Sequence, residues 1–413
     1  MTLRRRLDGG AVWAVTGLAS LCLAAILGVC GYVLVRGLGA FWPAPVVELS
    51  LRDGSVHLGE VVAWDDGFLV LRESETERVG AHYRRVARGD IAREARPDDA
   101  VSLQGADGRR LFVRGGEDPA PAVVVESLRP NVLSTLDRVG VTLARAARFV
   151  TGGATGSPWV GGMFPAIAGT LLLVMLMALF VVPLGTATAA FLHLRKGRAA
   201  RLVRGAVATL ASVPSIVYGV IGLGLFVHGL GRALDQWFHA AQQPVPVFGS
   251  GGLLWAALTL ALLTLPVFVT SVDQGLSRLP RSLEAGSLAL GATREQTLRM
   301  LLLPAAWPAM LTGLMLAVAR ACGAVAPLML VGVVELAPAL PLDGEFPYLH
   351  PSRQFMHLGH AVYDAAMANP DPFRGVSRAF AAAALLLAVV LVLNFVAMVL
   401  RDRLRERYRA LDD

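Results

Sequence analysis

Six long apolar runs constrain this chain more than any other feature of its sequence. They cover about Ala11–Val35, Met163–Leu192, Gly205–Gly229, Gly252–Val272, Pro304–Val334 and Val376–Leu400. Because a helix rises about 1.5 Å per residue, some 20 apolar residues cross the roughly 30 Å hydrocarbon core of a bilayer. The chain is 17% charged, against about 25% in soluble domains. The sequence therefore predicts an all-α polytopic membrane protein with six transmembrane helices.

Clusters of basic residues alternate with loops that are nearly free of them. The clusters are Arg4–Arg6, His193–Arg204, Arg278–Arg299 and Arg401–Arg409. The loops Gly231–Gly249 and Glu335–Gly375 hold only one and two arginines. Since cytoplasmic loops are enriched in Lys and Arg, we expect a multi-pass membrane protein with both termini cytoplasmic. The first run, of about 25 residues, is longer than a signal-peptide core and predicts an uncleaved anchor.

Residues 38–159 differ in residue pattern from the apolar runs, and they predict a separate extracytoplasmic domain. The stretch VVELSLRDGSVHLGEVVAWDDGFLVL alternates apolar and polar residues, and Asp53-Gly54 and Asp66-Gly67 are typical of hairpin turns. We expect a β-rich insert, built as a meander or a partly open barrel. A helical segment, Asn131–Thr151, and the glycine-rich hinge GGATGSPWVGG would return the chain to the membrane.

These patterns predict a division of the chain into three parts. Residues 1–37 would form the cytoplasmic N-terminus and the first transmembrane helix. Residues 38–159 would form the β-rich external domain with its helical return segment. Residues 160–413 would form a five-helix core that contains a long cytoplasmic loop, 273–304.

Several function classes lack the residues they need. The net charge of +7 comes without the basic, aromatic-interleaved runs of a nucleic-acid surface. Cys22, Cys30 and Cys322 lie in apolar runs and form no metal-binding spacing. No G-x-x-x-x-G-K-[ST] or G-x-S-x-G motif is present, so we expect no ATP hydrolysis by this chain, no other enzyme activity and no cofactor.

Three histidines near the end of the chain raise one further possibility. His350, His357 and His360, together with Asp364, have a spacing compatible with a metal site. No cysteine and no supporting second shell accompanies them. We favour a loop contact with a partner subunit, and predict no metal.

Arg320 stands inside the fifth apolar run, between Pro304 and Val334. If these residues formed one helix of about 46 Å, Arg320 would fall near the bilayer midplane. An unpartnered cation costs several kcal/mol there, so Arg320 must face protein or water. Intramembrane charges mark function by default, and the planar donors of arginine suit a tetrahedral oxyanion. We expect a role in an anion pathway, with a structural clamp as the alternative.

Pro214 and Ser215 predict a break or kink in the third apolar run, because proline frees backbone groups of a helix. Ser215 is therefore a second candidate for the substrate pathway. The alternative is helix–helix packing, which the small-residue spacing of Gly219 and Gly222 favours.

The loop LPRSLEAGSLALGATREQTLRMLLLP, from Leu279 to Pro304, predicts two short helices separated by Gly291. A polar helical loop between two spans suits the docking of a soluble partner. A simple amphipathic connector is the alternative. The final proline would open the fifth span.

At this loop the sequence resembles a known family. The spacing of Pro280, Gly291 and Leu303-Pro304 is similar to the EAA loop of ABC importer permeases. SVPSIVYGVIGLGLF, TGLMLAVARACGAVAPLML and FPYLHPSRQFMHLGHAVYD resemble stretches of the phosphate importer permeases, of the A-type (PstA-like) with an enlarged external insert. The resemblance covers residues 161–411 well and 1–35 loosely, and it assigns nothing to the domain between.

The resemblance implies a permease subunit of an ATP-driven phosphate importer. It would form the anion pathway with a second homologous permease, above a cytoplasmic ATPase dimer and below an extracytoplasmic phosphate-binding protein. The loop residues Pro280, Glu284, Ala285, Gly286, Gly291, Leu303 and Pro304 would couple the chain to the ATPase. A permease for another oxyanion, such as sulfate or molybdate, and a non-transporting phosphate-sensing scaffold remain alternatives.

Two positions depart from the family pattern. The Glu-Ala-Ala of the family falls on Ala285-Gly286-Ser287, while Glu284 lies one residue early, a rotation of about 100° on a helix. The family glutamate expected four residues after Arg320 is replaced by Ala324. Arg320 therefore lacks the i, i+4 partner that would be expected on its own helix.

Overall fold

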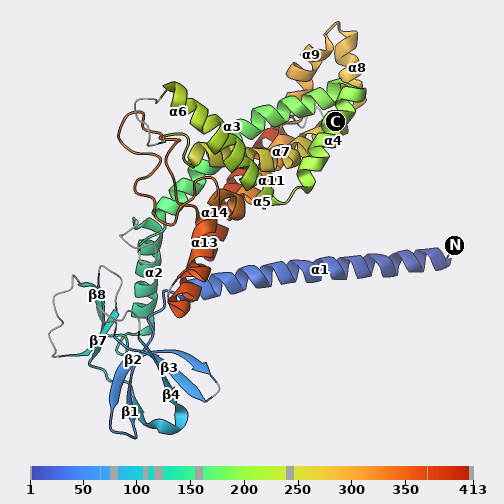
Figure 1. Ribbon diagram of the computed structural model, residues 1–413. Helices are drawn as coiled ribbons and strands as arrows, with labels where there is room; N and C mark the ends of the chain where they lie inside the picture. The colour runs from blue at the N-terminus through green and yellow to red at the C-terminus, as the bar shows by residue number, and fades with distance from the viewer. Residues whose placement is uncertain are drawn as a thin grey trace. The chain divides into compact units, whose positions relative to one another are not determined.

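The computed structural model describes residues 2–65, 67–74, 82–105, 110–115, 124–153, 161–238, 246–369 and 371–408. The chain divides into two compact units. Unit 1 comprises Met1–Gly162 and Ala365–Ala384, and unit 2 comprises Met163–Asp364 and Leu385–Asp413. Figure 1 shows the order of their elements.

Unit 1 begins with a long helix and continues into two antiparallel sheets and a shorter helix, and Ala365–Ala384 from later in the chain complete it. Its elements are α1 (Thr2–Gly39), β1 (Val46–Leu51), β2 (Val56–Asp65), β3 (Phe68–Arg72), β4 (Tyr83–Ala87), β5 (Ile91–Ala95), β6 (Ala100–Gly105), β7 (Arg110–Arg114), β8 (Val124–Leu128) and α2 (Thr135–Thr151). The strand order is β4-β3-β2-β1-β5 in one sheet and β7-β6-β8 in the other. Strands β1–β4 form the predicted meander, and β5 extends it beyond β1. The β-rich region is confirmed.

Alternation of side chains gives the larger sheet a buried face. Its core is formed by Val47, Leu49, Leu69, Leu71 and Val86. The predicted turn at Asp53-Gly54 joins β1 to β2, and Gly54 has φ +85°, where a side chain would be strained. Gly67, in the β2–β3 turn, has φ +87°, while Asp66 lies outside the described residues.

A capping box starts α2 at the predicted return segment. Ser134 Oγ accepts a hydrogen bond from Asp137 N, and Asp137 Oδ2 accepts one from Ser134 N at 3.2 Å. The two bonds satisfy amide groups that a helix N-terminus leaves without partners. The helix ends at Thr151, and residues 154–160 of the predicted hinge lie outside the described residues.

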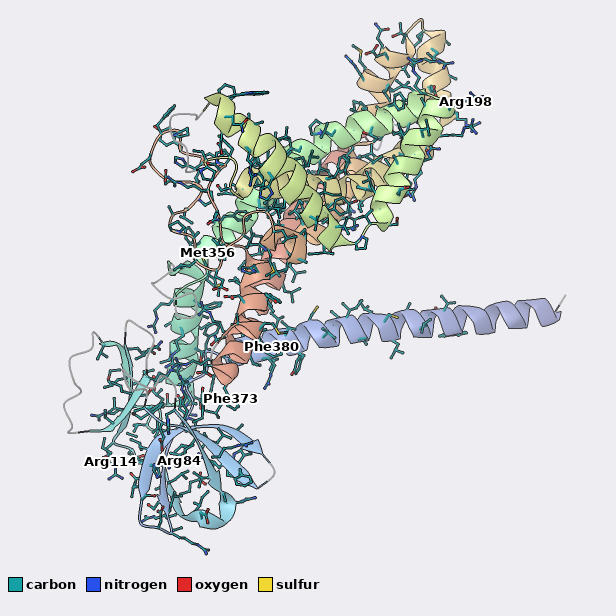
Figure 2. All side chains as sticks on the ribbon, in the orientation of Figure 1. Arg84, Arg114, Arg198, Met356, Phe373 and Phe380 are labelled. Carbon is teal, nitrogen blue, oxygen red and sulfur yellow. The ribbon has the colours of Figure 1, made fainter. Side chains whose placement is uncertain are left out.

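Unit 2 is helical. Its elements are α3 (Phe164–Leu194), α4 (Arg198–Ser212), α5 (Ser215–Ile221), the π-helical segment Gly222–Gly231, α6 (Arg232–Phe238), α7 (Leu253–Arg278), α8 (Arg281–Ala289), α9 (Arg294–Thr297), the π-helical segment Leu298–Leu302, α10 (Leu303–Ala305), α11 (Trp307–Cys322), α12 (Ala326–Met329), α13 (Leu358–Met367) and α14 (Pro372–Tyr408). Helix α13 ends, and α14 begins, in the segment assigned to unit 1. Figure 2 draws the side chains, with Arg198 labelled at the start of α4 and Phe373 and Phe380 on the first half of α14.

Small residues let the helices of unit 2 approach closely. A Cβ on Gly185 of α3 would lie 2.4 Å from the ring of Phe268, a fully buried residue of α7. A Cβ on Gly275 of α7 would lie 2.2 Å from Cβ of Ala309 in α11. Helices α3, α7 and α11 thus form the centre of the unit, by the small-residue packing common in membrane bundles.

Five described helices are long and apolar enough to cross a membrane, and the number rises to six if a bent pair is one span. The five are Val15–Gly39, Phe164–Leu194, Ser215–Phe238, Leu253–Arg278 and Phe373–Arg403. In the bent pair, Arg294–Ala305 and Trp307–Cys322 meet at 63°. The predicted fold class, a six-span helical membrane protein with a β-rich insert, is confirmed.

Two predicted spans have the wrong boundaries. The run Gly205–Gly229 is not one kinked span, because α4 ends at Ser212 and a new helix begins at Ser215, after Pro214. The run Pro304–Val334 is not one helix either, because the chain bends at Ala306 and α11 ends at Cys322. The 46 Å helix that put Arg320 at its middle does not form. The three-part division of the chain stays a prediction.

Candidate functional site

The loop between α7 and α11 contains the two predicted short helices. Pro280 directly precedes α8, and Gly291 follows it with φ +90°, a conformation that L side chains rarely adopt. Thr293 then caps α9 through a capping box with Gln296. The prediction of two helices separated at Gly291 is confirmed.

The two short helices are tied to each other and carry exposed apolar side chains. Ser287 of α8 and Thr297 of α9 share a hydrogen bond of 2.9 Å, and Thr297 is buried. Leu290, just before the turn, is 91% exposed, and Met300 is also strongly exposed. Helices α8 and α9 therefore form a helical hairpin, which this hydrogen bond holds together and which has Leu290 close to its turn.

Glu284 lies in the first turn of α8 and is half-buried. Among the described residues it makes no hydrogen bond or ion pair through its carboxylate. Ala285 and Gly286 are exposed, and a Cβ on Gly286 would meet open space. Helix α8 is α-helical from Arg281 to Ala289, and the part that Glu284 plays in docking stays a prediction.

Leu303 and Pro304 lie in α10, directly before the bend at Ala306. Pro304 does not open the fifth span as predicted, because the helix from Arg294 continues through it to Ala305. The new helix starts at Trp307 with Pro308 in its first turn, where proline is favoured. The two residues connect the loop to α11 across a sharp corner.

Arg320 lies in the last turn of α11, which ends at Cys322. Its side chain is half-buried, and among the described residues it makes no hydrogen bond or ion pair. The free carbonyl groups at a helix C-terminus carry partial negative charge and favour a cation there. The helix end therefore lowers the cost of this charge, although it supplies no counter-ion.

The charge of Arg320 acts on the hydroxyl of Tyr218, a residue of α5. Its ring is fully buried, and its hydroxyl donates a 2.5 Å hydrogen bond to the carbonyl of Leu210 in α4. Sequence patterns did not single out Tyr218, although a tyrosine in an apolar stretch directly after Pro214 is itself a signal. The hydrogen bond joins α5 to α4.

Ser215 begins α5, one helical turn before Tyr218 and Gly219, and its side chain is exposed. A Cβ on Gly219 would lie 2.7 Å from Cα of Pro327 in α12, and one on Gly222 would lie 2.2 Å from Oγ1 of Thr259 in α7. The two glycines are therefore packing positions. Ser215 takes part in neither contact, and its role stays a prediction.

Ala324 does not share a helix with Arg320. It follows Gly323 in a turn, and its amide donates to the carbonyl of Ala321 at 3.1 Å. Its side chain is buried in the core of unit 2. The i, i+4 geometry expected for a partner at this position is therefore absent, because α11 has already ended.

The three histidines are not gathered into one cluster in the described part of the chain. The described residues contain no group of three or more His, Cys, Asp or Glu side chains that could hold a metal ion. His350 pairs with Asp343 at 3.0 Å, away from His357 along the chain. Burial lowers the pKa of His357 to about 3, and burial also lowers the pKa of His360. Both rings are therefore neutral at physiological pH.

The segment around His357 is held on α3. The amide of Leu358 donates to Oγ1 of Thr170 at 2.9 Å, and a Cβ on Gly169 would lie 2.1 Å from the carbonyl oxygen of Met356, labelled in Figure 2. Nδ1 of His357 accepts a hydrogen bond from the amide of Gly359 at 3.1 Å. These contacts are internal, and the predicted contact with a partner subunit stays a prediction.

Comparison with known proteins covers the helical part of the chain. Residues 181–410 match the family described as the inner membrane component of binding-protein-dependent transport systems. The probable ABC transporter permease protein YqgH of Bacillus subtilis is 35% identical over 185 residues, which are 44% of this chain and 56% of YqgH. This chain thus spans about half the length of that relative.

Relatives named for phosphate transport match over longer stretches. The phosphate transport system permease protein PstA 1 of Mycobacterium tuberculosis is 30% identical over 244 residues, 59% of this chain and 71% of that protein. The PstA of Haemophilus influenzae is 31% identical over 238 residues, 57% of this chain and 73% of that protein. A chain of the inward-facing MetNI methionine ABC transporter has a TM-score of 0.42 at 19% identity, covering 60% of this chain and 95% of that one.

Proposed function

The chain belongs to the family of inner membrane components of binding-protein-dependent transport systems, and from this premise we propose that it is the permease subunit of a phosphate importer. It is an ABC importer permease, a component of membrane transport and not an enzyme. The observation that carries phosphate is the likeness to PstA proteins, about 30% identical over more than two thirds of their length.

The chemistry of Arg320 supports an anionic substrate. An arginine with no counter-ion among the described residues, at the end of a membrane helix, leaves its planar donors available to an oxyanion. Ser215 would contribute a hydroxyl from the start of α5, near Tyr218. In this proposal the anion pathway runs past these residues and is completed by a second homologous permease.

Membership of the family implies an ATPase and a binding protein as partners. We assign the energy source to a cytoplasmic ATPase dimer, because this sequence contains no P-loop. An extracytoplasmic phosphate-binding protein would deliver the substrate. The Arg-rich loops favour a topology with both termini cytoplasmic, which puts the α8–α9 hairpin on the ATPase side of the inner membrane.

Phosphate specificity is tested by purifying the assembled transporter and measuring ATP hydrolysis in liposomes. Loaded phosphate-binding protein should stimulate hydrolysis and drive uptake, and sulfate or molybdate with the same binding protein should not. Stimulation by sulfate instead would assign the chain to another oxyanion importer. Phosphate-dependent ATPase activity without uptake would favour the non-transporting sensor that the Ala285 and Ala324 departures allow.

The coupling role of the hairpin has its own test at Gly291. Valine cannot readily adopt φ +90°, so Gly291→Val should deform the turn between α8 and α9 and uncouple hydrolysis from uptake. The matched control is Ala292→Val, which adds the same side chain at the next residue, where φ is not positive. Uptake per ATP should fall several-fold in the first variant only. Equal uptake per ATP in both variants would contradict the coupling assignment.

A further inference from the structure

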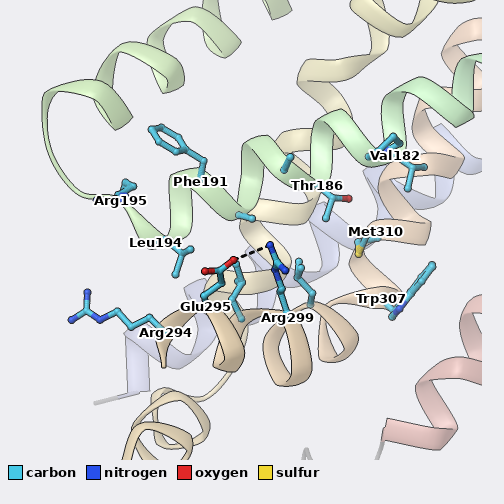
Figure 3. Close-up of a pocket in the computed structure, with 15 residues that line it drawn as sticks. Val182, Thr186, Phe191, Leu194, Arg195, Arg294, Glu295, Arg299, Trp307 and Met310 are labelled. Atoms are coloured by element: carbon cyan, nitrogen blue, oxygen red, sulfur yellow. Dashed lines mark ion pairs between the residues drawn. The ribbon is translucent and has the colours of Figure 1, made fainter. Parts of the chain in front are cut away.

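A cavity of about 860 Å³ lies between α3 and the chain that leaves the α8–α9 hairpin. One wall is the C-terminal part of α3, from Val182 to Arg195, and the other runs from Arg294 to Met310. Figure 3 shows the lining side chains converging from these two walls. The cavity is distinct from Arg320, Ser215 and Ala324, none of which lines it.

The cavity is cationic at one end. Its charged lining consists of Arg195, Arg294, Arg299 and Glu295, a net charge of +2 from three arginines and one glutamate. Arg299 pairs with Glu295 at 2.8 Å, the contact dashed in Figure 3. Among the described residues, the side chains of Arg195 and Arg294 make no hydrogen bond or ion pair. Two guanidinium groups are therefore available to an anion.

The opposite end of the cavity is apolar. Val182, Trp307 and Met310 lie there, away from Arg195 and Arg294, as Figure 3 shows. Val182 and Arg195 are 13 residues apart along the chain, which corresponds to about 20 Å of helix. One leaflet of a bilayer contributes about 15 Å of hydrocarbon. The cavity thus changes from cationic to apolar over the length of one lipid, including its headgroup.

We propose that this cavity binds one anionic phospholipid of the cytoplasmic leaflet. The phosphate group would lie between Arg195 and Arg294, with an acyl chain along Leu298, Trp307 and Met310. Basic pockets between membrane helices on the cytoplasmic side bind such headgroups. A free phosphate ion would leave the apolar half filled by water, so the length and polarity of the cavity favour a lipid. The site is independent of the transported substrate.

Bound lipid would connect α3 with the helix that leaves the hairpin. Arg195 belongs to the end of α3, while Arg294 is the first residue of α9. One headgroup that contacts both would hold α9 against α3 in the absence of a direct ion pair. Anionic lipid would then stiffen the base of the hairpin, and uptake per ATP should rise with its mole fraction.

Trp307 provides a direct probe of occupancy, because it lines the apolar end and is partly exposed. The full chain is reconstituted in phosphatidylcholine, and phosphatidylglycerol with brominated acyl chains is added to quench tryptophan fluorescence. Brominated phosphatidylglycerol should quench at about tenfold lower mole fraction than brominated phosphatidylcholine. Trp307→Phe should remove the excess quenching and leave that of the other tryptophans.

The arginines are tested with a charge-matched control. The Arg195→Gln/Arg294→Gln double variant should lose the preference for phosphatidylglycerol. The Arg198→Gln/Arg201→Gln double variant removes two exposed arginines of the neighbouring basic loop that do not line the cavity, and should keep it. Inorganic phosphate should compete no better than chloride of equal ionic strength.

Four results would overturn the proposal. They are equal quenching of the wild type by both lipids, an equal loss of preference in the two double variants, displacement of the lipid by inorganic phosphate, and loss of the preference once the ATPase and second permease are assembled. The last result would mean that a partner subunit covers the cavity.

Discussion

Arg72 in unit 1 and Arg320 in unit 2 differ in how the protein compensates their positive charge. Arg72 is only 4% exposed and lies 3.8 Å from Glu60 and 3.9 Å from Asp371. Glu60 is buried as well, and it accepts two hydrogen bonds from Arg110, at 3.0 and 3.1 Å. Arg320 has no carboxylate within reach among the described residues and relies on the end of its own helix.

The difference separates a charge that is part of the internal structure from a charge that is available to bind an anion. A buried ion pair contributes little net stability, yet removing one partner is costly because the other is left buried and uncompensated. An arginine without a counter-ion gains most from an anion that arrives from outside. Substitution of Arg72 should therefore lower the stability of unit 1, whereas substitution of Arg320 should lower transport.

The largest expected effect follows from Arg320. Arg320→Ala should abolish phosphate uptake while leaving membrane insertion and assembly intact, because removing the charge makes insertion easier. Arg320→Lys should retain weak uptake, since lysine keeps the charge but loses the planar donors. The measurement is radiolabelled phosphate uptake, normalised to assembled complex in the membrane. Wild-type uptake by the alanine variant would make Arg320 a packing or topology feature.

The second effect concerns stability in unit 1. Arg72→Ala leaves Glu60 and Asp371 with one cation fewer and should cost about 3 kcal/mol of unfolding free energy, measured on the full chain by proteolysis in increasing urea. The control is Arg93→Ala, an exposed arginine of β5, which should change stability by less than about 0.5 kcal/mol. Equal costs for the two substitutions would mean that the buried charges of unit 1 are not coupled.

Local signals predicted the parts of the fold that local chemistry decides. The turn at Asp53-Gly54, the break at Gly291 and the start of a helix after Pro214 each rest on a backbone conformation that only some residues adopt. The network around Asp371 has no such signal. Its members lie far apart in the sequence: the hydroxyl of Tyr83 donates to Asp371 at 2.6 Å across 288 residues.

The predicted bounds of the fifth span are wrong for a different reason. They follow the length of an apolar run, although signals that end and start a helix lie inside that run. Pro308 follows the bend at Ala306, and Gly323 with Pro327 beyond it marks a helix C-terminus. Hydropathy indicates which stretches of sequence a bilayer can accommodate, and it does not locate the ends of helices. The position of Arg320 at a C-terminus was therefore missed, while the sequence did show that position 324, four residues on, carries no carboxylate.

A third prediction tests whether position 324 can supply the missing carboxylate. Ala324 is buried, so Ala324→Glu alone should be destabilising unless the new carboxylate reaches Arg320. Because α11 ends before Ala324 and the i, i+4 geometry is absent, a double-mutant cycle with Arg320→Ala should be additive within about 0.5 kcal/mol, measured by unfolding in mixed micelles. The Ala324→Gln cycle is the control and should also be additive. A coupling of about 1–2 kcal/mol in the glutamate cycle alone would mean that Arg320 reaches position 324 in spite of the turn.

The smallest effect is expected at a partly exposed charge cluster in the loop between α12 and α13. A hydrogen bond from Arg353 holds the pKa of Asp343 at about 2, below its ordinary value of 3.8, and His350 adds a second hydrogen bond. Because the folded pKa is lowered, the contribution of Asp343 is complete above about pH 4 and is lost as the pH falls toward 2. Exposed ion pairs contribute little, so the global fold should survive.

A spin label on Phe346→Cys, an exposed position of the same loop, measures this local loosening. Its mobility should rise between pH 4 and pH 2 in the parent chain. In the Asp343→Asn background the loop should already be mobile at pH 7 and show no further change, because the titrating group is gone. An identical pH response in both backgrounds would assign the change to another carboxylate. In that case the ion pair between Asp343 and Arg353 would not hold the loop in place, in contrast to the buried ion pairs of Arg72, which we expect to stabilise unit 1.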